Sequence, residues 1–471
     1  MTAAGAVRRD AIPRALLPVA LVAVFSVLLG LAIAVFLPHD APATPLVLAG
    51  GAAALAVLAL AVASYRTAVA LGFALLGVVA VEPAPADGIF AVTIALALVT
   101  RRFRLVGVPV VMIVLLAGLV ALNVLSFTAA VDDLSAARFF AITLYLVVFT
   151  LWIAAYTSNA SRARTIARAY LLGAVPLAAL TSVALFVSFP GSELLLTEDG
   201  LRGKGPFKDP NVFGPFFVPL ALLLIEELLR PRLLAIGRVA AWVLLITVTA
   251  AVLFSYSRAA WLNLAVAMLG MLLILTLRRG GGRRAAVLLA ATISLAGMLA
   301  ITLAVTGSTG FLAERADFQA YDTQRFGAQA SSVRLAEEHP LGLGPGQFDE
   351  ASPLSAHSLY ARALAEQGFA GLAVVLLLVG GTLALAVRNA VKGVDTHGIG
   401  SAALFGAWCG LLLNSAVVDT LHWRHFWLVA ALIWAGAASR RRRMDSAGAP
   451  AAALGPKDQP RWATTAAGAG T

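Results

Sequence analysis

Repeated apolar runs, many of them close to the length of a membrane-spanning helix, constrain this chain most strongly. Of its 471 residues, 60% are hydrophobic and only 13% are charged, and the mean hydropathy is +0.90. A helix needs about 20 apolar residues to cross a hydrocarbon core of about 30 Å. Inside lipid the backbone must satisfy its own hydrogen bonds. The sequence therefore predicts an all-α fold, a polytopic transmembrane helical bundle.

We expect about fourteen spans, or twelve if some of the shorter runs are re-entrant. The first follows a basic N-terminus and exceeds the roughly 7 to 15 apolar residues of a signal-peptide core, so we expect it to stay as an uncleaved span. The expected spans are 15–37, 44–64, 67–81, 88–100, 105–125, 139–157, 170–189, 211–229, 239–254, 259–277, 285–306, 369–387, 398–417 and 426–438.

The charge pattern predicts the orientation. The net charge is +11, and the basic residues gather in alternate loops such as TRRFR, SRARTIAR, RRGGGRR and SRRRR, whereas acidic residues prevail in the others. This distribution follows the positive-inside rule. We therefore expect a multi-pass protein of the cytoplasmic (inner) membrane with both termini cytoplasmic. The lipid bilayer accounts for the basic total, so no nucleic acid partner is needed. The single cysteine, Cys409, excludes an intramolecular disulfide.

The expected organisation is one transmembrane domain and a tail. The domain covers residues 1–440 and has extracytoplasmic loops at about 190–210 and 307–356. The second loop should contain short helices, because Arg325, Ala328, Ser332 and Leu335 share one helical face before Pro340. Residues 441–471 are rich in Ala, Gly and Pro and are expected to form a disordered cytoplasmic tail.

The first long loop contains GLRGKGPFKDPNVFG, which places Arg202, Lys204 and Lys208 close together on an otherwise acidic side. Its glycines and prolines favour a tight backbone whose N–H groups can join the cations around a phosphate or pyrophosphate. The alternative is that these charges only contact lipid headgroups. In FSYSRAAWLNL, Arg258 lies at the outer membrane surface, where it can either snorkel or clamp a substrate phosphate.

The stretch SAHSLYARALAEQG combines two kinds of polar residue. Arg362 and Glu366 are four residues apart and predict a helical ion pair. His357 is out of phase with Glu366, so its partners must come from elsewhere. A neutral imidazole can take a proton from a sugar hydroxyl, although an interfacial histidine can also bind only water or headgroups.

A further polar cluster lies in DTLHWRH, where Asp419, His422 and His425 recur at three-residue intervals. Such a set could hold a metal, but aromatic and basic residues at a short outer loop commonly form an interfacial belt. We predict no metal site.

The order of motifs resembles the O-antigen ligase and polymerase superfamily, integral membrane glycosyltransferases that use polyprenyl-linked saccharides. The likeness covers about residues 170–390. It rests on RGKGPFKDPN, on SRAAWL, and on EEHPLGLGPGQF followed by AHSLYARALAEQG. The last pair is the most specific, because a Pro-Leu-Gly-x-Gly turn is followed by a histidine, then by Glu nine residues and Gly eleven residues later.

The resemblance implies a large outer loop over a cavity between membrane and water. Arg202 and Arg258 would hold the pyrophosphate of a polyprenyl-pyrophosphate-linked saccharide, and Arg325 could assist. His357 would activate a hydroxyl of a glycan or glycolipid acceptor.

The reaction implied is polymerisation or ligation of oligosaccharide at the outer face of the membrane, inverting and metal-independent, without a cofactor. Lys204 and Lys208 are also expected to bind the substrate. Many relatives have Asn after the histidine, whereas this chain has Ser358. The alternative function is a transporter or flippase of an anionic or lipid-linked solute, but the sequence shows no related halves of the kind expected for a transporter.

Overall fold

The protein is helical throughout the part of the chain that the computed structural model describes, which comprises residues 43–81, 83–231, 233–278, 280–305, 310, 320–352 and 354–448. Within these ranges there is no strand, only two isolated β-bridges. The all-α prediction is confirmed. The helices are α2 (Ala43–Ala63), α3 (Tyr65–Ala74), α4 (Pro85–Val99), α5 (Val110–Phe127), α6 (Asp133–Tyr156), α7 (Ala160–Ala184), η1 (Ser192–Leu195), α8 (Pro210–Leu229), α9 (Arg238–Phe254), α10 (Arg258–Leu277), α11 (Gly282–Val305), α13 (Ala320–Glu338), α14 (Phe348–Ala351), α15 (Leu359–Val391), α16 (Ser401–Val417) and α17 (Arg424–Gly448).

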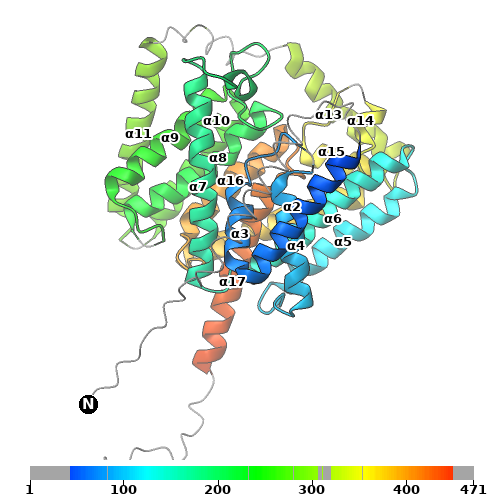
Figure 1. Cartoon of the computed structure of the whole chain (residues 1–471), viewed down its shortest axis with the longest axis horizontal. Helices are drawn as coiled ribbons and strands as arrows, with labels where there is room; N and C mark the ends of the chain where they lie inside the picture. The colour runs from blue at the N-terminus through cyan, green and yellow to red at the C-terminus, as the bar shows by residue number, and fades with distance from the viewer. Residues whose placement is uncertain are drawn as a thin grey trace, which may run out of the picture.

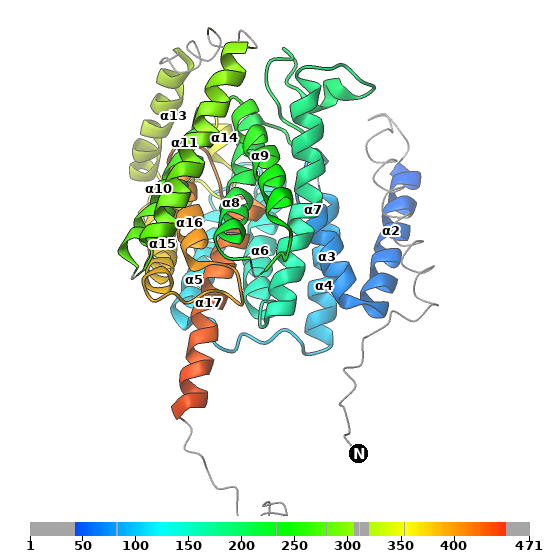
Figure 2. The same cartoon turned by 90° about the vertical axis from the view of Figure 1, so that its left-hand side faces the viewer.

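Apolar helices long enough to cross a membrane make up the body of the bundle. Six helices of the described chain meet this condition by length and composition, namely α5, α6, α7, α8, α10 and α15. Shorter apolar helices pack beside them, among them α4, α9 and α16. The chain is thus a multi-pass membrane protein. Figures 1 and 2 show α13 and α14 at one end of the bundle, whereas α17 projects from the opposite end.

The predicted spans from 44–64 onward all fall on helices, but one is shorter than expected. The run 67–81 holds α3, which ends at Ala74 and has 10 residues. At about 1.5 Å per residue, α3 is about half as long as a perpendicular span. The chain then turns, and Val79 N–H donates to the carbonyl oxygen of Pro206 at 3.0 Å. The apolar composition of residues 67–81 correctly indicates that the segment is buried, but it does not reveal the turn that ends α3.

The two ends of the chain lie largely outside the described residues. The predicted span 15–37 falls there, as does most of the predicted disordered tail. The first residues of that tail segment are helical, because α17 extends to Gly448.

One end of the bundle carries the long connections, and we call it the loop face. It comprises residues 186–209, 255–257, 320–352, 354–358 and 418–423, and three helices begin there with a side-chain cap. Asp209 accepts from Asn211 N–H at 2.7 Å before α8, and Ser257 accepts from Ala260 N–H at 3.3 Å before α10. Ser358 caps α15 in the same way. Each cap satisfies a backbone donor at a helix start.

Helices α10 and α16 approach each other closely inside the bundle. A Cβ atom at Gly406 would collide with the carbonyl oxygen of Ala267, and one at Gly410 would collide with the side chain of Asn263. Small residues at such positions allow helix backbones to pack tightly in a membrane.

Helix α15 is interrupted at Gly368, whose φ of 66° and ψ of −169° are not helical. Two backbone donors of the PLGLG turn fill the gap: Leu343 N–H bonds to the carbonyl of Ala365 at 3.0 Å, and Gly344 N–H bonds to that of Glu366 at 3.1 Å. The turn motif and the EQG motif are therefore two halves of one structure.

Replacing Gly368 should destabilise the protein. Its backbone conformation is essentially restricted to glycine, and an added Cβ would collide with the carbonyl oxygen of Pro340. We expect Gly368→Ala to lower the free energy of unfolding by about 1–3 kcal/mol. Gly380→Ala is the matched control in the same helix, because a Cβ there meets nothing within 4 Å. Unfolding in detergent, followed by circular dichroism, distinguishes the two; equal stability of both variants would contradict the account.

Candidate functional site

Arg202 lies on a hairpin of the first loop that packs against the end of α9. Its Nε donates to the carbonyl oxygen of Ser255 at 3.1 Å, and Gly203 N–H donates to that of Phe254 at 3.0 Å. The start of α8 is joined to the start of α10, because Ser257 Oγ donates to Asn211 Oδ1 at 2.6 Å. Arg202 is thus fixed beside the segment that leads directly into Arg258.

Arg258 and Arg325 line one cavity on the loop face, which we call the arginine cavity. It has a volume of about 200 Å³ between α10, α13 and the end of α16. Arg258 Nη2 contacts both carboxylate oxygens of Asp322, at 2.6 and 2.8 Å. Arg325 donates to the carbonyl oxygen of Val417. The cavity lining consists of Arg258, Ala259, Leu262, Asp322, Arg325, Phe326, Gln329 and Val417.

His357 adjoins this cavity through its backbone. Gln329 lines the cavity, and its Nε2 donates to the carbonyl oxygen of His357 at 3.0 Å. The backbone of His357 lies in the left-handed region, at φ +43°, which is uncommon for residues other than glycine. The next residue, Ser358, caps α15, and its Oγ lies 3.4 Å from the carbonyl oxygen of Ser415.

The pKa of His357 is lowered from its ordinary value of 6.5. Burial of the half-buried ring is the largest cause, and the positive charge of Arg325 is the second. The carboxylates of Asp209, Asp349 and Asp419 act in the opposite direction and are weaker. At neutral pH the imidazole is therefore uncharged and able to accept a proton.

The arginine cavity brings together two of the five cations singled out in the sequence, Arg258 and Arg325. Arg202 does not line it; its side chain contacts the connection between α9 and α10 that leads to Arg258. Lys204 and Lys208 lie further along the first loop, half-buried and exposed respectively, and neither lines the arginine cavity.

Helix starts add to the positive potential of this region. α10 begins at Arg258 itself, α15 begins just after His357, and α8 begins after Asp209, whose charge acts on His357. The N-terminus of a helix carries a partial positive charge and free N–H groups, which favours anions.

A second polar group, beside the cavity, joins three segments of the loop face. The buried Arg362 contacts Glu366 at 2.6 Å, Asp349 at 3.1 Å and Asp419 at 2.6 Å. The pair with Glu366 is the predicted one, and the other two carboxylates come from α14 and from the connection between α16 and α17. Arg362 also lies over the ring of Phe139, 5.2 Å from its centroid.

The residues of DTLHWRH have separate partners. Asp419 contacts Arg362, whereas His422 Nε2 lies 3.1 Å from Thr143 Oγ1 and its ring packs on Phe139. His425 is buried among aromatic rings, including that of Phe216. These contacts are structural packing contacts.

Sequence reasoning missed two residues of the arginine cavity, Asp322 and Gln329. Both lie on the same face of α13 as Arg325, three residues before it and four residues after it. That helical spacing was visible in the sequence, but only the ion pair across to α10 shows that Asp322 belongs to Arg258.

The loop face thus presents arginines, helix starts and a neutral histidine at the edge of a helical membrane bundle. Residues 242–376 match the family model of O-antigen ligases, and this match supports the resemblance to the O-antigen ligase and polymerase superfamily. The match supports glycosyltransferase activity of the O-antigen ligase type. No curated protein matches the chain at a significant level.

Removing Arg362 should destabilise the loop face strongly. Glu366 is fully buried and would lose its charged partner, and breaking such a pair typically costs about 3–5 kcal/mol. We expect Arg362→Met to lower the thermal unfolding temperature markedly, whereas Arg334→Met, at an exposed position of α13, should change it little. If Arg362→Met has the same unfolding temperature as the wild type, the ion pairs of Arg362 with Glu366, Asp349 and Asp419 do not hold the loop face together.

Proposed function

We propose that this protein polymerises or ligates oligosaccharide, transferring it from a polyprenyl-pyrophosphate carrier to a glycan or glycolipid acceptor. In this proposal the loop face is the outer face of the cytoplasmic membrane, and both termini are cytoplasmic. One observation carries it: Arg258 and Arg325 line a single cavity whose wall residue Gln329 holds the backbone of His357. The family match supports the same class of reaction.

The donor pyrophosphate would bind at the arginine cavity. A guanidinium can hold phosphate oxygens in a bidentate manner. In this structure a single nitrogen of Arg258, Nη2, contacts both carboxylate oxygens of Asp322. The pyrophosphate therefore competes with Asp322 for Arg258. Further positive charge around the same anion comes from Arg325, Arg202 and the start of α10. Lys204 and Lys208, on the first loop, add to it.

The transfer itself requires a base and a stabilised leaving group. The imidazole of His357 takes the proton of the acceptor hydroxyl, and the hydroxyl oxygen bonds to the anomeric carbon. The bond from that carbon to the phosphate oxygen breaks, and its electron pair leaves with the polyprenyl pyrophosphate. Attack opposite to the leaving group inverts the anomeric configuration. The arginines stabilise the charge that develops on the leaving group, so the proposed step uses no metal.

Loss of the imidazole should abolish transfer. We expect His357→Ala to form no product from a lipid-pyrophosphate oligosaccharide and an acceptor, with unchanged unfolding temperature. His339→Ala, at an exposed histidine of the same loop, is the matched control and should stay active. Full activity of His357→Ala would remove the general-base role. Movement of the lipid-linked saccharide across a vesicle membrane without glycan extension would instead favour a flippase.

Arg258 should be sensitive to a change that keeps its charge. Arg258→Lys retains one positive charge but loses the planar, two-pronged contact. We expect transfer to fall at least tenfold and the KM for the donor to rise, measured with the same assay. Arg334→Lys, on the exposed side of α13, controls for the chemical change and should leave both constants unaltered.

The rate should fall on the acid side of the pH profile as His357 becomes protonated. Because the pKa of His357 is lowered from 6.5, half of the maximal rate should be reached below pH 6.5, and the rate should then stay constant toward neutral pH. Arg325→Gln removes a positive charge that lowers this pKa, so its acid limb should shift upward. A limb that does not move in Arg325→Gln would show that another group controls the profile.

A further inference from the structure

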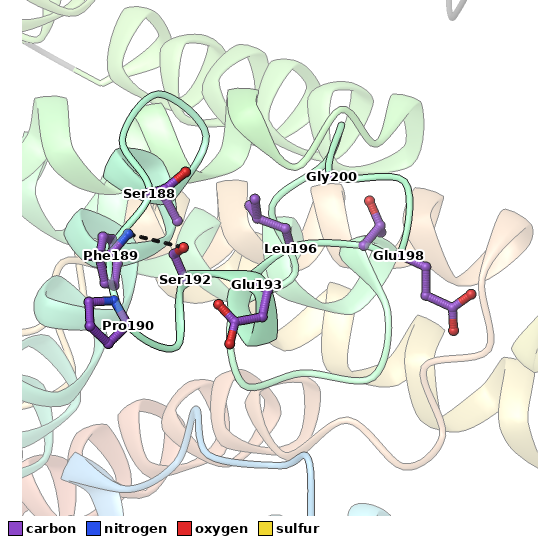
Figure 3. A pocket seen from close by; sticks show the side chains of 10 residues that line it. Ser188, Phe189, Pro190, Ser192, Glu193, Leu196, Glu198 and Gly200 are labelled. Carbon is purple, nitrogen blue, oxygen red and sulfur yellow. Dashed lines mark hydrogen bonds between the residues drawn. The ribbon is translucent and has the colours of Figure 1, made fainter.

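A second, larger cavity lies on the loop face, beside the hairpin that carries Arg202. We call it the hairpin pocket; its volume is about 600 Å³. Figure 3 shows Ser188, Phe189 and Ser192 along one side of it and Glu198 and Gly200 along the other. The lining residues are Ala184, Ser188, Phe189, Pro190, Ser192, Glu193, Leu196, Thr197, Glu198 and Gly200.

The backbone around this pocket is well defined by local hydrogen bonds. Phe189 N–H donates to Ser192 Oγ at 3.3 Å, and Gly191 takes the left-handed conformation that starts η1, at φ +84°. On the other side, Gly200 N–H donates to the carbonyl oxygen of Thr197 at 2.8 Å.

The chemistry of the lining fits a sugar. The carboxylates of Glu193 and Glu198 can accept hydrogen bonds from hydroxyl groups, and the serine hydroxyls can accept or donate them. Phe189 and Leu196 add apolar surface against which the face of a sugar ring can pack. Among the residues that the structure describes, no lysine or arginine lines the pocket. Two carboxylates without a cation disfavour phosphates and sugar acids, because like charges repel.

The pocket and Arg202 belong to the same hairpin. Thr197 lines the pocket, its N–H donates to the carbonyl oxygen of Arg202 at 2.9 Å, and its Oγ1 accepts from Arg202 N–H at 3.2 Å. The side chain of Arg202 then leads away to Ser255. The hairpin pocket is therefore connected, through the backbone of the hairpin, to Arg202, which we propose to bind the donor pyrophosphate.

We propose that the hairpin pocket is a saccharide-binding subsite that takes uncharged or amino sugars and rejects uronic acids. It holds sugar units beyond the one that reacts, on either the lipid-linked donor or the acceptor glycan. The inference rests on the proposed function for the origin of the saccharide, but the binding itself does not require catalysis.

The test is binding of the full-length protein, in fluorescent lipid nanodiscs, to immobilised oligosaccharides of neutral, amino and uronic acid sugars. We expect the wild-type protein to retain neutral or amino oligosaccharides and not the uronic acid ones. The double variant Glu193→Gln/Glu198→Gln should bind at least tenfold more weakly. The matched control is Glu337→Gln/Glu338→Gln, two exposed glutamates of α13 outside the pocket, which should bind like the wild type.

The outcomes separate the two proposals. His357→Ala should keep wild-type binding, so retained binding without transfer would preserve the subsite and overturn the proposed reaction. No binding by the wild type, preference for uronic acids, or wild-type binding by the double variant would falsify the subsite. In the transfer assay, a raised KM of the double variant for the lipid-linked donor assigns the subsite to the donor, and a raised KM for the acceptor assigns it to the acceptor.

Discussion

The break in α15 at Gly368 determines how the loop face is built. A helix that stops at the membrane edge leaves carbonyl groups without their usual partners, and lipid offers no replacement. Here the N–H groups of Leu343 and Gly344 supply them, so a turn distant in the sequence must dock at this point. The same turn continues into Gln347, whose Oε1 accepts from the N–H groups of Val131 and Asp132, both at 2.9 Å. One interruption of a helix therefore fixes the end of α13, the start of α14 and the connection between α5 and α6.

The motifs on which the family resemblance rests have structural roles in this chain. Asp209, Ser257 and Ser358 cap α8, α10 and α15, and each lies next to or close to a residue proposed to act on substrate. A cap defines where the helix begins, and it thereby defines where the partial positive charge of the helix start is presented. Ser358, which follows the proposed base His357, has this capping role for α15.

Much of this architecture was predictable because the apolar composition of membrane helices can be recognised in the sequence. The helix positions, the Arg362–Glu366 pair and the helix over Arg325 all depend on periodicities within one segment. The length of α3 did not follow, since an apolar run does not reveal the turn that ends it. Nor did the pairing of Arg258 with Asp322 or of Arg362 with Asp419, because those partners are far apart in the sequence and only the packing of α10, α13 and α15 brings them together. The chemical roles of His357 and the arginines remain predictions.

The close approach of α10 and α16 connects the middle of the membrane to the proposed chemistry at its surface. Arg258 opens α10, and Val417, whose carbonyl anchors Arg325, closes α16. The spacing of these two cavity walls is therefore determined at Gly406 and Gly410, where an added methyl group would push the helices apart. The width of the arginine cavity therefore depends on residues that are buried between two helices and do not line the cavity themselves.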